Sequence, residues 1–261
     1  MFFSQVKQVI LENDPQHKIR MLHDLHARFT AAELALTKQD SVDSIPIPGR
    51  PQQPELVHPS QVARRKLSSE QGRIALIHAV CHIEFNAINL ALDAAYRFQD
   101  MPIDYYRDWL RVAAEEAKHF SLLAARLRQL GSAYGDLTAH NGLWEMAVKT
   151  QSSLVERMAL VPRVLEARGL DVTPGMIERL QAVDDLETVR ILTIILADEI
   201  GHVEVGTRWF KYACQQADCD PQATFIQLLQ QYEVGYAKGP LHIQARQQAG
   251  FSEAEMNALT G

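Results

Sequence analysis

The sequence predicts an all-α protein built on a four-helix bundle, with extra helices at both ends of the chain. The alternating, β-branched and glycine-punctuated runs that mark strands are missing, so most of the chain reads as helix. A chain of 261 residues with 47% hydrophobic and 22% charged residues can bury a large core and is ordinary for a soluble globular protein. Prolines and glycines then divide the chain into helices.

We expect residues 1–60 to form an N-terminal helical hairpin followed by a proline-rich arm. The hairpin would consist of helices over 2–12 and 16–39, separated at Asp14-Pro15. The arm, "SIPIPGRPQQPELVHPS" at 44–60, has five prolines and cannot be helical. It is either a flexible linker or an ordered strap, because it offers apolar contacts at Ile45, Ile47, Leu56 and Val57.

Residues 61–218 are expected to form the bundle, and residues 219–261 a C-terminal helical extension. The second helix should begin at Pro102 and end at Gly131, a natural C-terminal cap position. Asp184 with Glu187 is a plausible capping box for the last long helix. The expected helices cover 61–98, 102–130, a segment from 143 that weakens at Pro162 and Gly169, a short helix from Thr173-Pro174 to 182, and 185–217.

Charge and cysteine content limit the classes of function. The formal net charge of −6 gives no general reason to expect strong phosphate binding. Three cysteines without a Cys-x-x-Cys pattern suit a reducing cytoplasm better than a disulfide framework. The N-terminus does not resemble a signal peptide, and no apolar run is long enough to span a membrane. We therefore expect a cytoplasmic protein with no membrane partner.

Charged residues interrupt the apolar stripes of the predicted helices in a repeated pattern. "EEAKH" at 115–119 places Glu116 and His119 beside Val112, Phe120 and Leu123, where a charge is expensive unless something pairs with it. "DEIGH" at 198–202 repeats the pattern with Glu199 and His202. Glutamate and histidine three residues apart share one face of a helix, so one helix can offer both to a metal ion.

Each Glu-x-x-His follows a helix that carries another acid. Glu84 lies in an otherwise apolar stripe before Glu116, and Glu166 precedes Glu199 at almost the same separation in sequence. Residues equidistant from the turn of an antiparallel hairpin lie at one level, and the first set has its midpoint near 101, at a predicted turn. The second midpoint lies near 183, but Gly169 and Pro174 interrupt the path, so Glu156 is the fallback to Glu166.

Four carboxylates and two imidazoles inside a bundle indicate a site for two metal ions. Two divalent cations balance four carboxylates, and this ligand set is the pattern of the di-iron and di-manganese carboxylate proteins. Oxygen and imidazole ligands suit iron, with manganese as the alternative. The predicted ligands are Glu84, Glu116, His119, Glu166, Glu199 and His202.

The acid just before each Glu-x-x-His occupies the same place in both copies. A metal-bound histidine usually donates its other ring N–H to a carboxylate, so Glu115 and Asp198 are predicted to orient the histidines. The alternative for Glu115 is a solvated surface residue. His78 and His82 point away from the Glu84 face, and we assign them packing or outer hydrogen-bond roles. Trp209 is interpreted as core packing.

At these residues the sequence resembles the ferritin-like superfamily, and more closely an uncharacterised bacterial branch of it. The resemblance covers about residues 60–215 and implies a four-helix bundle with Glu116 and Glu199 as bridging ligands. A more distant likeness, at "EAR" around Glu166, is to tRNA-modifying di-iron hydroxylases; it supports Glu166 but not a tRNA substrate. The stretches that carry the likeness are "HIEFNAINLALDAAYRF", "EEAKHFSLL", "YGDLTAHNGLWE", "MALVPRVLEARGLDVTP" and "DEIGHVEVGTRWF".

Two irons in such a site predict an O2-activating oxidoreductase, of the monooxygenase type, acting on an unidentified small molecule or RNA. An electron donor and a homodimer are the further partners we expect. The alternative is an iron-binding and iron-oxidising protein without an organic substrate, and a third interpretation is a structural protein with a vestigial site. The N- and C-terminal additions argue against a plain storage subunit.

Overall fold

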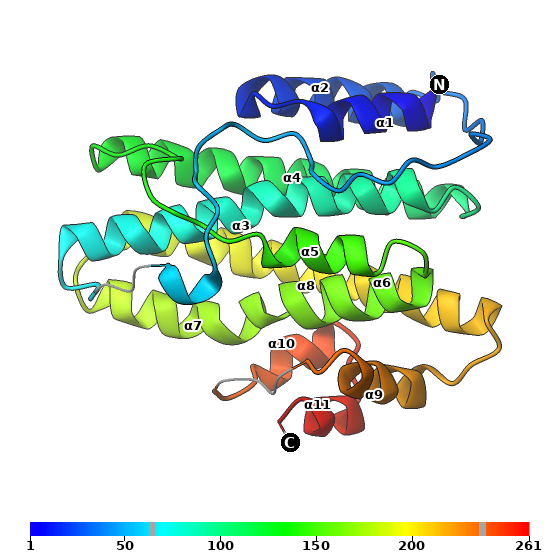
Figure 1. The fold of residues 1–261 in the computed structure, drawn as a ribbon. Helices are drawn as coiled ribbons and strands as arrows, with labels where there is room; N and C mark the ends of the chain where they lie inside the picture. The colour runs from blue at the N-terminus through cyan, green and yellow to red at the C-terminus, as the bar shows by residue number, and fades with distance from the viewer. Residues whose placement is uncertain (63–65, 235–238, 261) are drawn as a thin grey trace. The chain divides into compact units, whose positions relative to one another are not determined.

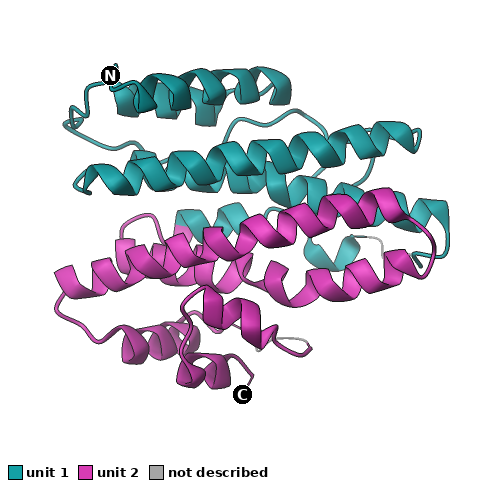
Figure 2. Cartoon of the chain, turned by 180° about the vertical axis from the view of Figure 1, so that it is seen from behind, with its two compact units in different colours: residues 1–148 teal, residues 149–261 magenta. Residues whose placement is uncertain are grey.

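The structure is a computed structural model that describes residues 1–62, 66–234 and 239–260. Within those ranges it is helical, with no β-strand and one isolated parallel bridge, between Leu56 and Ala139. The all-α prediction is therefore confirmed. The chain divides into two compact units, residues 1–148 and 149–261, coloured separately in Figure 2. The domain boundaries expected at residues 60 and 218 stay predictions.

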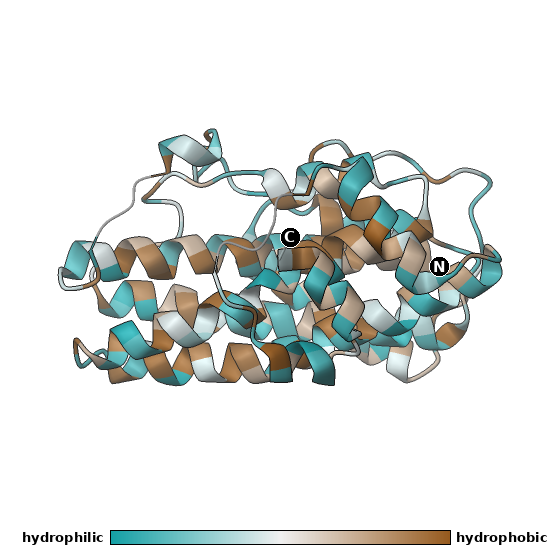
Figure 3. Cartoon of the chain, turned by 90° about the horizontal axis from the view of Figure 1, so that it is seen from below, coloured by the Kyte–Doolittle hydropathy of each residue, from teal (hydrophilic) through white to brown (hydrophobic). Residues whose placement is uncertain are grey.

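The first unit is built on a hairpin of two long helices. The helix α3 packs along α4, while α1 packs against α3 and α2 against α4 (Figure 1). Seen by hydropathy, the helices alternate hydrophobic and hydrophilic residues along their length, as amphipathic helices do (Figure 3). The elements are α1 (Phe2–Leu11), α2 (Pro15–Thr30), η1 (Pro59–Gln61), α3 (Glu70–Arg97), α4 (Ile103–Gln129) and α5 (Gly142–Lys149).

Helix α3 is the core helix of this unit. It begins at Glu70 rather than near 61, because the Ser69 side chain accepts a hydrogen bond from the backbone N–H of Gly72 and caps the helix there. Residues 63–65 of the predicted span lie outside the described residues. Of the described helices, α3 alone is long and apolar enough to cross a membrane, yet 72% of its apolar window is buried. Burial within the protein thus accounts for its composition.

The ends of α4 agree with the sequence prediction, and the end of α2 does not. Pro102 precedes α4, and Gly131 follows it with a φ of 71°, the left-handed conformation expected of a capping glycine. The sequence predicts that α2 reaches residue 39, but the helix ends at Thr30, and Ala32 takes a φ of 58°. The freed segment bonds the start of α1, since the Phe2 N–H donates to the Ala35 carbonyl. Tertiary contact overrides good helix propensity there.

The proline-rich arm is an ordered strap on the first unit. Its Val57 N–H donates to the Ala139 carbonyl at 2.8 Å, and the Gly49 N–H donates to the Ile10 carbonyl at 2.8 Å. Ile45 is buried, and its carbonyl accepts a hydrogen bond from the Trp144 indole N–H. The strap interpretation is therefore confirmed over the flexible linker, although Ile47 is exposed.

A buried lysine joins the strap to the helices of the first unit. Lys18 lies on the apolar stripe of α2, and its ammonium donates to the Ile10 carbonyl at 3.0 Å and to the Gly49 carbonyl at 2.9 Å. It also donates to the Asn89 side-chain oxygen and lies 5.2 Å from the centre of the Phe85 ring. Burial lowers the pKa of Lys18 to about 7, against a smaller rise caused by Glu12.

The second unit is built on α8 and the helical path that packs along it. Helices α6 and α7 and the π-helical segment η2 between them all contact α8, and α9 and α10 pack on α8 from the C-terminal region. The elements are α6 (Leu154–Leu160), η2 (Val161–Glu166), α7 (Arg168–Gln181), α8 (Leu186–Gln216), α9 (Pro221–Gln231), α10 (Ile243–Gln248) and α11 (Glu253–Thr260).

Three helix ends in this half of the chain differ from the prediction. The helix expected from residue 143 is two helices, because α5 ends at Lys149 and Ser153 caps a new start for α6. Pro174 lies inside α7 instead of starting a helix; burial of Leu170 and Leu180 outweighs the hydrogen bond that proline cannot make. Asp185, not Asp184, caps α8.

The pH dependence of the free energy of unfolding should reveal the lowered pKa of the buried Lys18. The unfolded lysine has a pKa near 10.5 and the folded one about 7, so the unfolded state binds more protons between these values. The free energy of unfolding should therefore rise with pH across that window, by at most about 1.4 kcal/mol per pH unit. Denaturant unfolding of wild type against Lys18→Met should show this slope only in wild type.

Lys38→Met is the matched control, because Lys38 forms an exposed ion pair with Asp100. It should keep the wild-type slope, since exposed pairs contribute little to stability. Equal slopes in Lys18→Met and wild type would contradict the assignment.

Candidate metal centre

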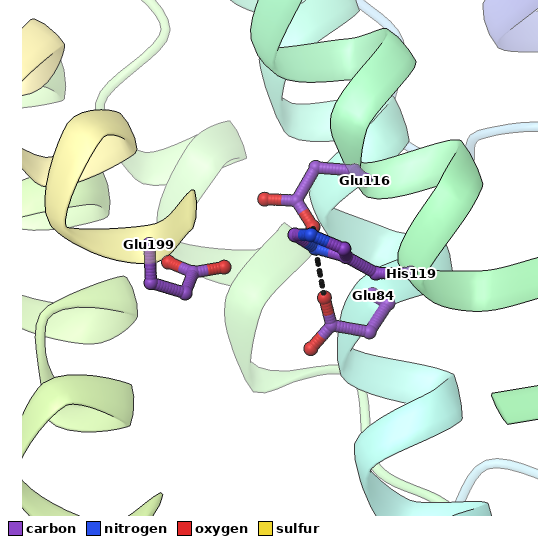
Figure 4. Close-up of side chains that lie close together, drawn as sticks. All are labelled: Glu84, Glu116, His119 and Glu199. Carbon is purple, nitrogen blue, oxygen red and sulfur yellow. Dashed lines mark hydrogen bonds and ion pairs between the residues drawn. The ribbon is translucent and has the colours of Figure 1, made fainter. Parts of the chain in front are cut away.

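The first unit brings three predicted ligands together in its core. Glu116 and His119 lie one turn apart on α4, and Glu84 lies on α3. The His119 Nδ1 is 3.1 Å from the Glu84 Oε2 and 3.3 Å from the Glu116 Oε2 (Figure 4). Each of the three offers a candidate ligand atom, and these atoms lie within 4.8 Å of one another. We call these three residues the Glu84 cluster.

The hairpin turn places Glu84 opposite His119. Both residues are nearly equidistant in sequence from Met101, which lies in the turn between α3 and α4. The contact between their side chains confirms that the two residues share a level. Counting along the sequence therefore predicts this juxtaposition correctly.

Burial gives the Glu84 cluster unusual electrostatics. Glu84, Glu116 and His119 are 3%, 1% and 0% exposed, so any charge on them is largely removed from water. Burial by itself lowers the pKa of His119, but hydrogen bonds and charge attraction from Glu116 and Glu84 outweigh it and raise the pKa to about 11. The metal-free protein therefore holds a proton on His119 at neutral pH.

The nearby cysteine does not belong to this donor set. The Cys81 thiol contacts the Phe120 carbonyl, with sulfur and oxygen 3.9 Å apart. Burial and the neighbouring Glu84 raise the pKa of Cys81, so it keeps its proton and is a poor ligand. The candidate donors of the cluster are thus carboxylate oxygens and an imidazole nitrogen.

The second unit carries the repeated Glu-x-x-His on α8. Glu199 and His202 are both buried, and the His202 Nδ1 is 3.4 Å from the Glu199 Oε1. Figure 4 also labels Glu199. The pair has the same spacing on its helix as Glu116 and His119, and both histidines are fully buried.

Glu166 is the last residue of η2 and is half-buried. The interruption expected at Gly169 does not occur, because the helix continues through η2 and past this glycine into α7. The fallback acid, Glu156, is engaged elsewhere: its Oε2 accepts a hydrogen bond of 2.7 Å from the Tyr232 hydroxyl. Glu166 as a metal ligand stays a prediction.

The acids predicted to orient the histidines have different surroundings. Glu115 forms an ion pair with Arg111 one turn earlier on α4, at 3.1 Å, and its side chain is 30% exposed. Asp198 is half-buried on α8. Their assistance to the histidines stays a prediction. Trp209 is buried and contacts Tyr212 edge to face, which agrees with a packing role.

His78 and His82 hold a loop rather than a metal ion. The His82 Nδ1 is 3.0 Å from the Tyr134 hydroxyl, and its Nε2 is 3.1 Å from the His140 carbonyl oxygen. The His78 Nε2 accepts from the backbone N–H of Gly135 at 3.0 Å. Both rings stack on Tyr134. The packing and hydrogen-bond interpretation of the two histidines is confirmed.

Sequence reasoning missed Lys18 and Tyr134 as organisers of the first unit. Lys18 gave a signal, because a lysine at the stripe position four residues before Leu22 and seven before Leu25 breaks an apolar face as Glu116 does. Tyr134 gave none, since its hydrogen-bond partner, His82, lies on α3 and is distant in the sequence.

The fold and the site define the class of this protein: it is all-helical and has a buried glutamate–histidine cluster. The chain belongs to the family described as "Protein of unknown function (DUF455)", which matches residues 11–257. An "Uncharacterized protein" of Haemophilus influenzae is 43% identical over 266 residues, spanning 98% of this chain and 92% of its own. No solved structure matches the chain.

Metal binding should release protons. A metal ion can bind His119 only after its ring nitrogen loses its proton, and the raised pKa means that the proton is present at neutral pH. Adding Mn²⁺ or Fe²⁺ without oxygen to weakly buffered metal-free protein should release about one proton per protonated ligand. Affinity should rise with pH.

The His119→Gln variant should release at least one proton fewer than wild type. His78→Gln is the control, because His78 bonds the loop backbone and should leave the release unchanged. Metal binding that is independent of pH would contradict the assignment of His119 as a ligand.

Proposed function

We propose that this protein is a di-iron carboxylate protein that uses O2 to oxidise an organic substrate. Its fold would be a ferritin-like four-helix bundle, the fold that the family resemblance implies. The observation that carries the proposal is the Glu84 cluster, a buried set of three candidate ligands whose sequence pattern recurs in the second unit.

The donor set fits iron. Carboxylate oxygens and imidazole nitrogens suit iron and manganese, whereas the soft cysteine beside Glu84 stays protonated and bonded to the backbone. Buried carboxylates are costly in the absence of a compensating charge, and a divalent ion provides one. Manganese is the alternative metal, and metal analysis of protein purified without chelator distinguishes the two.

The two copies of the pattern would divide the ligands between two ions. Glu84, Glu116 and His119 would hold one, and Glu166, Glu199 and His202 the other. By resemblance to the ferritin-like superfamily, Glu116 and Glu199 would bridge. Glu115 and Asp198 would accept ring N–H groups and fix the orientation of the imidazoles.

The irons, when bound, would supply oxygen activation: one oxygen atom enters the substrate, the other leaves as water, and two electrons and two protons come from outside. The contribution of this chain is geometric and electrostatic. Its buried acids neutralise the ions, and the apolar residues of α3 and α4 around the Glu84 cluster exclude water. Such exclusion protects reactive chemistry from side reactions.

The proposal includes partners that this chemistry requires. An electron donor would supply the two electrons of each turnover, and the substrate would be a small molecule or RNA. With a formal net charge of −6, the chain offers no overall attraction to phosphate, which favours a small molecule. A cytoplasmic homodimer is the assembly we propose.

The second candidate function is iron binding and oxidation without an organic substrate. It uses the same ligands, and the resemblance to ferritins favours it. Storage requires a large hollow assembly, whereas this chain adds an N-terminal hairpin, a strap and C-terminal helices to the long helices. We expect size-exclusion chromatography with light scattering to give a small oligomer. A large hollow shell would favour storage.

Iron stoichiometry tests the proposed centre. Anaerobic loading should give about two Fe²⁺ per chain, and oxygen exposure should then produce a new absorption in the near-ultraviolet and visible region. Glu116→Ala/Glu199→Ala should lose the iron and the absorption, because each substitution removes a carboxylate ligand. Iron is measured by elemental analysis after desalting.

Glu156→Gln is the control, since this acid is bonded to Tyr232, and it should keep both irons. No iron uptake by wild type, or unchanged stoichiometry in the double variant, would refute the di-iron proposal.

A further inference from the structure

Pro162 explains why the helix widens into the π-helical segment η2, whose last residue is Glu166. A proline has no backbone N–H to donate, and its ring clashes with the carbonyl four residues earlier, here that of Met158. The backbone hydrogen bonds of the helix lengthen their sequence spacing there: the Ala167 N–H donates to the Pro162 carbonyl, five residues back, at 3.0 Å. Such π segments inside helices occur frequently at functional sites.

Pro162 is seated on a glycine of α8. A Cβ atom added to Gly206 would lie 2.5 Å from the Pro162 Cβ and 2.6 Å from its Cγ, closer than real Cβ contacts come. The proline ring is rigid and cannot yield as a flexible side chain would. Glycine inside a helix is less favourable than alanine, so this close approach explains why a glycine stands at position 206.

The seat sets the register between η2 and α8. The two run antiparallel around the turn at Asp184, whose φ is 58°. Pro162 and Gly206 are equidistant in sequence from Asp184, and Glu166 and His202 are also equidistant from it. Four residues along α8 from the seat, at about 1.5 Å per residue, lead to His202, and four residues along η2, where the rise per residue is smaller, lead to Glu166, so the two side chains lie close to one level.

The same face of α8 carries the seat and the candidate ligands. Glu199, His202 and Gly206 follow one another at spacings of three and four residues, which keeps them on one side of the helix. Pro162 and Glu166, also four residues apart, are neighbours along η2. The contact between Pro162 and Gly206 at one end of this face therefore controls whether Glu166 lies opposite the candidate ligands at the other end.

A second contact fastens η2 to α8 and to the C-terminal helices. The fully buried Arg163 donates from Nε to the Thr207 hydroxyl at 3.1 Å and from Nη2 to the Glu255 carboxylate at 2.8 Å. Its guanidinium carbon lies 4.3–4.8 Å from the centres of three aromatic rings, those of Phe210, Phe225 and Phe251. Neighbouring residues of η2 thus contact neighbouring residues of α8.

We propose that Gly206 and Pro162 are positioning residues that set Glu166 opposite His202, with Arg163 and Glu255 fastening the segment from the other side. The C-terminal helices thereby gain a role, since α11 supplies Glu255 to the π segment that ends in Glu166. The inference rests on the proposed function, because the value of this register is that it aligns metal ligands.

The register is tested first without metal. In Glu166→Cys/His202→Cys, oxidation should form a disulfide, because residues at one level on facing helices come within bridging distance. Glu166→Cys/Glu204→Cys is the control pair, since Glu204 is exposed on another side of α8. Peptide mass spectrometry identifies the linkage against the native cysteines. A control pair that links as readily as the test pair would overturn the register.

The seat is tested by substitution. Gly206→Ala should lower the affinity for one of the two metal ions by about 10- to 100-fold, the usual effect of disturbing ligand positioning. It should also slow linkage of the 166/202 cysteine pair. Pro162→Ala should impair both properties as well, because it restores a backbone N–H in η2 and removes the ring that packs on Gly206. Gly201→Ala, with open space at its Cβ, should leave both unchanged.

The outcomes separate the two proposals. Efficient linkage of the 166/202 cysteine pair, together with a wild-type protein that binds no metal, would support the register and refute the di-iron function. Normal metal affinity and linkage in folded Gly206→Ala would overturn the positioning role, as would normal values of both in folded Pro162→Ala. If Gly206→Ala does not fold, the cysteine pairs in the Gly206 background decide the register.

Discussion

The burial of glutamates beside a histidine is the interaction on which the first unit depends. Glu84 and Glu116 approach His119 from two helices, and the three side chains are almost fully removed from water. Isolated charges there would destabilise the fold by several kcal/mol, so the group must share protons or bind cations. The hairpin of α3 and α4 provides the rigid frame, because each acid lies within a long helix that is packed along its length.

Departures from regular helix occur where the chain must position a group. Lys18 donates hydrogen bonds to carbonyls at the end of α1 and in the strap, and thereby joins segments whose contact no sequence pattern predicts. Pro162 widens one turn of the path along α8, and Gly206 provides room for it. In each case a locally unfavourable residue, whether a buried cation, a proline inside a helix or a glycine inside a helix, is compensated by a specific tertiary contact.

Prediction succeeded where the period of the helix and the distance to a turn carry the information. The opposition of Glu84 and His119 follows from counting residues on both sides of Met101, and the contact is found. The path to Glu166 could not be followed in the same way, because proline and glycine ordinarily end helices. Pro162, Gly169 and Pro174 nevertheless lie within one helical path, while α2 ends at Thr30, inside a segment of good helix formers.

The sequence by itself determined the helical class, the long helices and the repeated acid and Glu-x-x-His pattern, because these depend on periodicity and local stereochemistry. Only the tertiary structure decided that the proline arm is an ordered strap, that Lys18 is buried and that Glu156 is bonded to Tyr232. It also decided that Pro162 rests on Gly206. Those features join residues far apart in the chain, and the free energy that selects them comes from packing and from satisfying buried polar groups, which no local pattern encodes.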